Sequence, residues 1–171
     1  GTLNWCWYLL ARHPRVEARL IAELAAQTPG DAFTFDQLME LEYAACVLKE
    51  TLRLYPPVWL FSRRALKDDR LGDFVVPAGA HIFIAPYFLH RRPELWPDPE
   101  RFDPDRFDAS RSPPVDRYAF IPFSAGARRC IGEYFSFVEM QMHLALLAPR
   151  FALGFGPGEP APAVELEPAV K

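Results

Sequence analysis

The sequence predicts an α+β protein that is mainly helical and carries one small antiparallel sheet. Four helices are expected before residue 56, and strand-like sequence is confined to residues 58–85. A long apolar helix is expected over residues 131–147. The 171 residues suit one domain or a piece of a larger one.

The first two helices are separated at Pro14. Residues 3–12 are apolar on most faces, which is typical of the end of a buried helix. Pro14 suits the first turn of a second helix, in which apolar side chains recur at helical spacing up to Gln27. The turn-forming residues at 28–30 are expected to end it.

The chain then changes from helix to strand. A short helix over residues 36–41 and a longer one over 43–55 are expected, and Pro56-Pro57 stops the second because proline lacks the helical N–H donor. Pro77-Ala78-Gly79 predicts a turn between two strands. The strands of the small sheet are expected over residues 58–65, 74–76 and 81–85.

Residues 93–114 form a proline-rich stretch that is interpreted as an ordered meander. Its six prolines exclude a regular helix. Trp96, Phe102 and Phe107 argue against disorder, because large aromatic side chains favour packing on a core. Three weaker elements are expected outside it: a short helix at 87–91 and strand character at 150–154 and 164–166.

Composition excludes several classes of protein. The net charge is −3 with no Lys/Arg tract, so no nucleic-acid partner is expected. No apolar run is long enough to cross a membrane, and residues 1–12 do not resemble a signal peptide. Because Gly1 opens directly into helical sequence, we expect the natural N-terminus, and any membrane anchor or targeting segment, to lie upstream.

The three cysteines, Cys6, Cys46 and Cys130, are far apart and form no Cys-x-x-Cys pair. A disulfide framework and a structural zinc site are therefore not expected. The pattern favours a reduced cytoplasmic setting with one reactive cysteine.

Cys130 is the strongest candidate for a reactive cysteine, because it lies in a loop just before the predicted long helix. Free N–H groups and the positive dipole end at a helix N-terminus, together with Arg128 and Arg129, favour thiolate over thiol. Gly126 and Gly132 permit tight turns and close approach to a flat ligand. The competing interpretation is a small buried apolar residue, the more common state of a free cysteine.

The neighbours of Cys130 decide between these interpretations. The pattern F-x-x-G-x-R-x-C-x-G, at Phe123, Gly126, Arg128, Cys130 and Gly132, resembles the haem-binding signature of the cytochrome P-450 family. Five fixed residues at average usage would coincide in such a chain with a probability on the order of one in ten thousand or less.

The resemblance implies roles for these residues around haem b. It implies that Cys130 is the axial thiolate on the iron and that Phe123 shields the sulfur. Gly126 would make room for the porphyrin, and Arg128 would contact a propionate. Arg129 falls at a variable position of the signature and receives no haem role.

Other motifs support the resemblance. Glu50 and Arg53 lie three positions apart on one helix, so they can pair, and they resemble the family's E-x-x-R motif. Pro99-Glu100-Arg101-Phe102 resembles the meander motif, which implies a buried triad of Glu50, Arg53 and Arg101 that holds the cysteine loop. Arg64, five positions before Asp69, resembles the arginine at the other propionate, with Arg63 as its competitor.

The resemblance implies the C-terminal part of the family's fold, from the end of the long central helix through the haem-ligand loop and the following helix. Residues 1–171 would then be a partial domain. The oxygen-activating acid–alcohol pair is expected before Gly1, and residues 164–168 resemble a final hairpin without its return strand. We therefore expect no turnover from residues 1–171 alone.

The implied activity is that of a haem-thiolate monooxygenase, which inserts one oxygen atom of O2 into a small organic substrate. Apolar residues at 58–61 resemble a substrate-lining segment and favour an apolar substrate. A ferredoxin or flavoprotein reductase would dock near Arg128 and Arg129. Two alternatives remain open: a peroxygenase or isomerase that needs no redox partner, and a non-catalytic haem-binding remnant.

Overall fold

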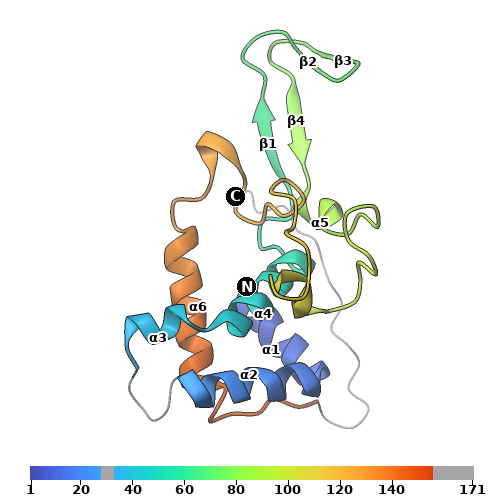
Figure 1. Cartoon of the computed structure of the whole chain (residues 1–171). Coiled ribbons are helices and arrows are strands. Elements are labelled where there is room, and N and C mark those ends of the chain that lie inside the picture. Colours follow the sequence, from blue (N-terminus) through green and yellow to red (C-terminus); the bar gives the residue numbers. More distant parts are fainter. Residues whose placement is uncertain (28–32, 156–171) are drawn as a thin grey trace.

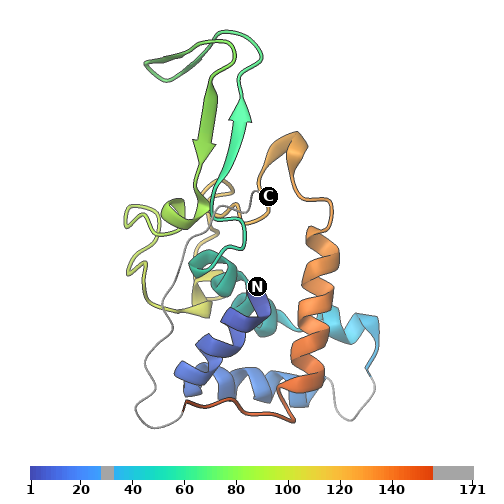
Figure 2. The same ribbon diagram turned by 180° about the vertical axis from the view of Figure 1, so that it is seen from behind.

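The computed structural model of the chain describes residues 1–27 and 33–155 (Figure 1). It is a helical body with a narrow β-hairpin that projects from it, a shape seen from both sides in Figures 1 and 2. This arrangement confirms the predicted α+β class. The residues predicted to end the second helix (28–30) and to form the last strand (164–166) lie outside the described residues.

Five helices make up most of the body. Their bounds are Thr2–Arg12 (α1), Pro14–Gln27 (α2), Phe35–Met39 (α3), Glu42–Leu54 (α4) and Glu133–Leu147 (α6). Each lies within about two residues of a predicted helix. The long helix begins at Glu133 instead of residue 131, because Gly132 is its N-cap.

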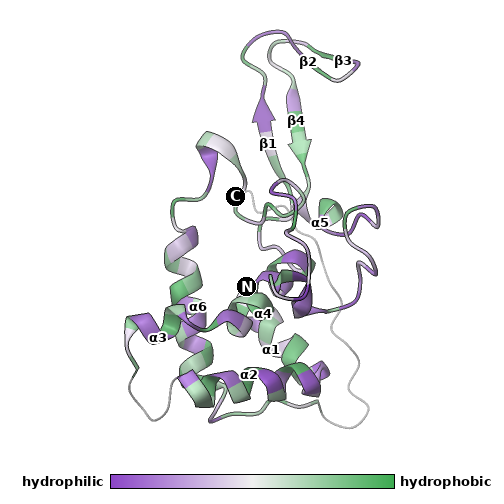
Figure 3. Cartoon of the chain, in the orientation of Figure 1, coloured by the Kyte–Doolittle hydropathy of each residue, from purple (hydrophilic) through white to green (hydrophobic). Residues whose placement is uncertain are grey.

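Helix α4 is the centre of the body and contacts α1, α2 and α6. Ten of its thirteen residues are buried, so most of its faces meet other elements. Its apolar side chains join a core that includes Leu10 of α1, Leu20 and Leu24 of α2, and Leu144 of α6, all with no exposed area. Figure 3 shows hydrophobic colouring on α1 and on the C-terminal turns of α6.

Helices α3 and α4, on either side of Leu41, are capped at their N-termini in two different ways. Thr34 and Gln37 form a reciprocal capping box that begins α3. Helix α4 has no side-chain cap of its own. Instead the Glu23 carboxylate, from α2, accepts hydrogen bonds from the N–H groups of Tyr43 at 2.6 Å and Ala44 at 2.8 Å. The negative charge also complements the helix dipole, so α2 fixes where α4 begins.

The predicted sheet is in fact two separate antiparallel ladders. Strands β1 (Phe61–Arg64) and β4 (His81–Ile84) pair in one, and β2 (Asp69–Leu71) and β3 (Phe74–Val76) pair in the other. Strand β2 was not predicted, because its residues are all exposed and carry no apolar alternation. The strand predicted at 150–154 does not form in the described part of the chain.

The meander is irregular but packed, as predicted. Trp96 and Phe102 are 2% and 5% exposed. A single 3-10 turn, η1 (Pro104–Phe107), interrupts the irregular path and lies against α4. The short helix α5 (Pro86–Leu89) precedes it. Among the described residues, no helix is long and apolar enough to cross a membrane.

Candidate functional site

The cysteine loop is closed by its own backbone. The Cys130 N–H donates to the Phe123 carbonyl at 2.9 Å, and the Arg129 N–H donates to the Gly126 carbonyl at 3.0 Å, across the turn η2 (Gly126–Arg128). Gly126 has φ +72°, a conformation that favours glycine. Helix α6 begins three residues after Cys130. The predicted loop before a helix is therefore confirmed.

Cys130 differs from the other two cysteines in its accessibility. Its side chain is exposed, whereas Cys6 and Cys46 are buried. Burial raises the pKa of Cys6 to about 12 and that of Cys46 to about 11, because a thiolate would lose its solvation. Cys130 is the cysteine that a ligand from outside can reach.

A cavity of about 640 Å³ opens beside Cys130. Three arginines line it, Arg63, Arg64 and Arg128, and no carboxylate does among the described residues. The rest of its wall is largely apolar and includes Leu52, Pro57, Val58, Phe61, Phe123 and Met140. A thiol, apolar walls and an excess of cations suit a flat apolar ligand with anionic groups, so these residues fit a haem with its propionates.

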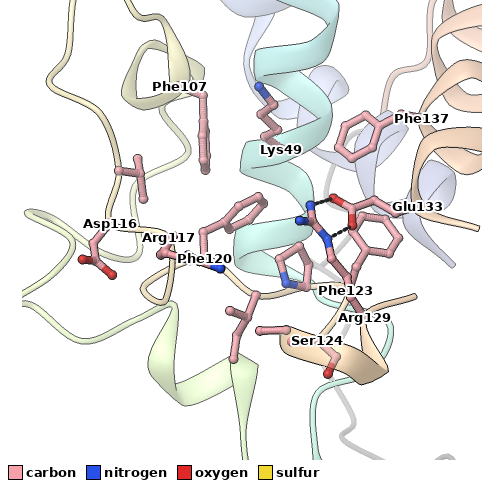
Figure 4. Close-up of a pocket in the computed structure, with 15 residues that line it drawn as sticks. Lys49, Phe107, Asp116, Arg117, Phe120, Phe123, Ser124, Arg129, Glu133 and Phe137 are labelled. Carbon is pink, nitrogen blue, oxygen red and sulfur yellow. Dashed lines mark hydrogen bonds and ion pairs between the residues drawn. The ribbon is translucent and has the colours of Figure 1, made fainter. Parts of the chain in front are cut away.

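A second cavity, of about 340 Å³, lies on another side of the loop (Figure 4). Aromatic rings line it, from Phe107, Phe120, Phe123 and Phe137. At its rim the Arg129 guanidinium forms two hydrogen bonds to the Glu133 carboxylate, drawn as dashed lines in Figure 4, one of them 2.6 Å long. Glu133 thus balances the charge of Arg129, whereas no carboxylate among the described residues forms an ion pair with the arginines of the Cys130 cavity.

Four of the five residues predicted to contact haem meet at the larger cavity: Cys130, Arg128, Arg64 and Phe123. Gly126 lines the second cavity instead. A Cβ added at Gly126 would meet nothing within 4 Å, so the structure gives this glycine a conformational role and shows no close approach there.

The two adjacent arginines of β1 have different surroundings. Side chains alternate along a strand, and Arg63 shares the half-buried face with Phe61, whose ring lies 4.8 Å from its guanidinium. Arg63 also donates to the Ser124 hydroxyl at 2.7 Å. Arg64 is exposed, on the opposite face. Both line the cavity, but Arg63 is tied directly to the cysteine loop.

Glu50 and Arg53 form a fully buried ion pair, as their spacing predicts. Both side chains are 0% exposed, and Arg53 binds both carboxylate oxygens, at 2.7 and 2.8 Å. Burial raises the pKa of Glu50 despite the opposing effect of Arg53. The remaining Arg53 donors reach the carbonyls of residues 90, 99 and 101. Arg53 thereby joins α4 to the meander.

The structure corrects the predicted third member of this network. The Arg101 side chain is 68% exposed and lies 3.8 Å from Asp103, and only its carbonyl reaches Arg53. Arg106, at 12% exposure, lies 3.4 Å from the Glu50 carboxylate instead. The sequence held a signal for it, because Pro-x-Arg-Phe occurs twice, at 99–102 and 104–107. The turn η1 directs the second arginine towards α4.

His90 is a site residue that received no role from the sequence. It is 0% exposed and follows α5 as its C-cap. Its carbonyl accepts from Arg53 at 2.8 Å, and its Nε2 accepts from the Ile121 N–H at 3.0 Å. Among the described residues, no group of three or more His, Cys, Asp or Glu side chains could hold a metal ion.

Comparisons with known proteins agree with this geometry. A family model described as Cytochrome P450 matches residues 1–170. The chain therefore belongs to the cytochrome P450 family.

Individual relatives come from bacteria and mammals. Cyclooctat-9-en-7-ol 5-monooxygenase of Streptomyces melanosporofaciens is 42% identical over 158 residues, which is 92% of this chain and 34% of the relative. Cytochrome P450 4V2 of Mus musculus is 40% identical over 88% of this chain and 29% of its own length. Pentalenene oxygenase of Streptomyces avermitilis is 38% identical, with 92% and 35% covered. The chain spans about a third of the length of these relatives.

Proposed function

We propose that the protein carrying this chain is a haem-thiolate monooxygenase, which inserts one oxygen atom of O2 into an apolar organic substrate. One observation carries this proposal: an exposed Cys130 thiol shares a cavity with three arginines and an apolar wall. The names of the relatives, two of which are oxygenases, support the reaction class.

Different residues of this chain would bind different parts of a haem b. Cys130 would hold the iron through its thiolate, and Phe123, half-buried beside it, would keep water from the sulfur. Arg128, with Arg64 or its neighbour Arg63, would bind the propionates. When bound, the haem supplies the oxygen chemistry, and a thiolate ligand favours O–O cleavage.

The buried network has a supporting role in this proposal. Glu50, Arg53 and Arg106 do not line the Cys130 cavity. They hold the meander on α4, and the meander leads directly into the cysteine loop. We therefore assign them to the position of Cys130 and give them no part in the reaction.

The substrate class follows only from the chemistry of the cavity wall. Leu52, Val58 and Phe61 present apolar surface next to Cys130. Relatives with different names, from Streptomyces and from mouse, match at 42%, 38% and 40% identity, so identity does not single out one substrate. An apolar organic molecule is the class proposed.

The electron donor is proposed to be a ferredoxin or a flavoprotein reductase that docks beside the cysteine loop. Arg128 and Arg129 are both exposed there. An acidic patch on the electron donor would be electrostatically complementary to these two cations. Arg129 is paired with Glu133 and Arg128 also lines the Cys130 cavity, so both are proposed as contacts at the exposed face of the loop.

The spectrum of the reduced carbon monoxide complex tests this proposal. The haem-loaded full-length protein should show the strongly red-shifted Soret band of thiolate ligation, and Cys130→Ser should abolish it. Cys46→Ser is the matched control and should keep the band, because that thiol is buried away from the cavity. A Cys130→Ser protein that retains the band would refute the assignment. Product formation with O2 and a surrogate reductase would then test the reaction class.

A further inference from the structure

The backbone of Ile121 is held on both sides before the chain enters the cysteine loop. Its N–H donates to His90 Nε2 at 3.0 Å, and its carbonyl accepts the N–H of Ser124 at 3.1 Å. Phe123, two residues further on, accepts the N–H of Cys130 at 2.9 Å. His90 thus holds Ile121, which lies two residues before Phe123, the residue whose carbonyl closes the loop by accepting from Cys130.

The hydrogen bond to Ile121 fixes the protonation state of His90. A backbone N–H can only donate, so Nε2 must carry a lone pair and the ring must be neutral, with its proton on Nδ1. Nδ1 is buried and has no partner among the described residues. A proton added at Nε2 would therefore replace an acceptor with a donor that faces another donor.

The charges around the ring oppose a second proton. Arg53 of α4 and the adjacent Arg91 are both cations, and Glu50, the nearby carboxylate on α4, is engaged by Arg53 in two hydrogen bonds. Phe120 and Ile121, which contact the His90 ring from the segment just before the cysteine loop, carry no charge. Burial is the larger effect, and together they lower the pKa of His90 to about 4.

We propose that His90 is a positioning residue whose neutral ring couples the Arg53 network to the cysteine loop, and whose protonation releases the loop. The His90 carbonyl holds Arg53, and its ring holds Ile121. One residue thus connects the buried ion pair to the segment that presents Cys130. The inference rests on the proposed function, because loop position is read through thiolate ligation of haem.

The sign of the pH effect follows from the lowered pKa. The pKa of His90 in the unfolded chain is near 6.5. Above that pH, His90 is neutral in the folded and in the unfolded protein, so its titration does not change stability. As pH falls from about 6.5 towards about 4, His90 becomes protonated when the loop is released or unfolded but stays neutral in the native protein. The native loop position is therefore lost progressively in this window.

The experiment follows the thiolate Soret band of the carbon monoxide complex from pH 7.5 to pH 4, in the haem-loaded full-length protein. His90→Gln supplies an amide oxygen as acceptor without a titrating group. It should keep the band at pH 7.5 and lower the midpoint of acid loss by about one pH unit. His90→Leu removes the acceptor and should lose most of the band already at pH 7.5. His81→Gln, at an exposed histidine, should titrate like the unmodified protein.

Each outcome decides the inference. An acid midpoint for His90→Gln equal to that of the unmodified protein, in the presence of a normal band at pH 7.5, would overturn it. If His90→Leu does not fold by circular dichroism, the His90→Gln midpoint alone decides. An unmodified protein without the thiolate band would instead refute the proposed function, so the two failures are distinguishable.

Discussion

The Glu50–Arg53 pair and the Cys130 loop are opposite in how completely the chain satisfies them. Arg53 is 0% exposed and makes five hydrogen bonds, two to Glu50 and three to carbonyls of the meander. Cys130 is exposed, and the next residue, Ile131, is fully exposed although it is apolar. The buried pair is satisfied by groups of the chain itself, whereas the loop presents groups that an external ligand or partner can engage.

This difference separates the buried residues of this chain that support the loop from the accessible thiol. Burying a charged pair costs free energy, since both groups lose water, and the raised pKa of Glu50 reflects that cost. Such a pair resists change because any altered member leaves the other unsatisfied. A reactive thiol needs an accessible position instead. Cys130 accordingly lines the cavity, whereas Glu50 and Arg53 do not.

Removal of one member of the buried pair is expected to have the largest effect. Arg53→Ala or Glu50→Ala should lower the free energy of unfolding by roughly 3–5 kcal/mol, because an unpaired charge remains buried. In the full-length protein, both should cut haem incorporation without altering substrate selectivity. Urea denaturation and haem content measure these effects. Glu100→Ala, at a 73% exposed glutamate, is the matched control and should stay within about 0.5 kcal/mol. Fully haem-loaded Arg53→Ala protein would contradict the supporting role.

The three cysteines should differ strongly in their rates of alkylation. In the native haem-free protein at pH 8, iodoacetamide should label Cys130 on the order of a hundredfold faster than Cys6 or Cys46, because buried thiols are inaccessible and form little thiolate. Burial raises the pKa values of the latter two to about 12 and 11. Peptide mass spectrometry after short labelling gives the rates, and labelling in urea is the control that should equalise them. Native labelling of Cys6 at the rate of Cys130 would show that the core is open.

A smaller effect separates the two meander arginines. Arg106→Ala should lower the free energy of unfolding by about 1–2 kcal/mol, because Arg106 is 12% exposed and adds positive charge beside Glu50. Arg101→Ala should change it by less than about 0.5 kcal/mol, since that side chain is 68% exposed. Both are measured by urea denaturation of otherwise identical proteins. A larger loss at Arg101 would restore the assignment that the sequence suggested.

Local patterns predicted the helices well and singled out Cys130 as the candidate haem ligand. The helices followed from apolar periodicity and proline boundaries, and α1, α2 and α4 lie within a residue of their predicted ends. Cys130 stood out because glycines and arginines at fixed spacing surround it. Glu50 and Arg53 were found because three positions on one helix place two side chains together without help from the rest of the fold.

Features that depend on the path of the chain were not predicted. Two copies of Pro-x-Arg-Phe lie five residues apart, and only the fold decides that Arg106, and not Arg101, reaches Glu50. Strand β2 is defined by its pairing with β3 across the turn at Gly72, which has φ +58°. The bond between His90 and Ile121 joins residues 31 positions apart. No local pattern carries such information.

The acceptors that Arg53 uses in the meander have a consequence for how this segment can vary. All three are backbone carbonyls, at positions 90, 99 and 101, and every amino acid supplies a carbonyl. The requirement at positions 99 and 101 is therefore on the course of the chain and not on the identity of the side chain. Point substitutions at these two positions leave the acceptors in place, whereas the loss or gain of one residue between 90 and 101 would move them out of register. The side chains at positions 99 and 101 can thus vary, while the number of residues between 90 and 101 stays fixed.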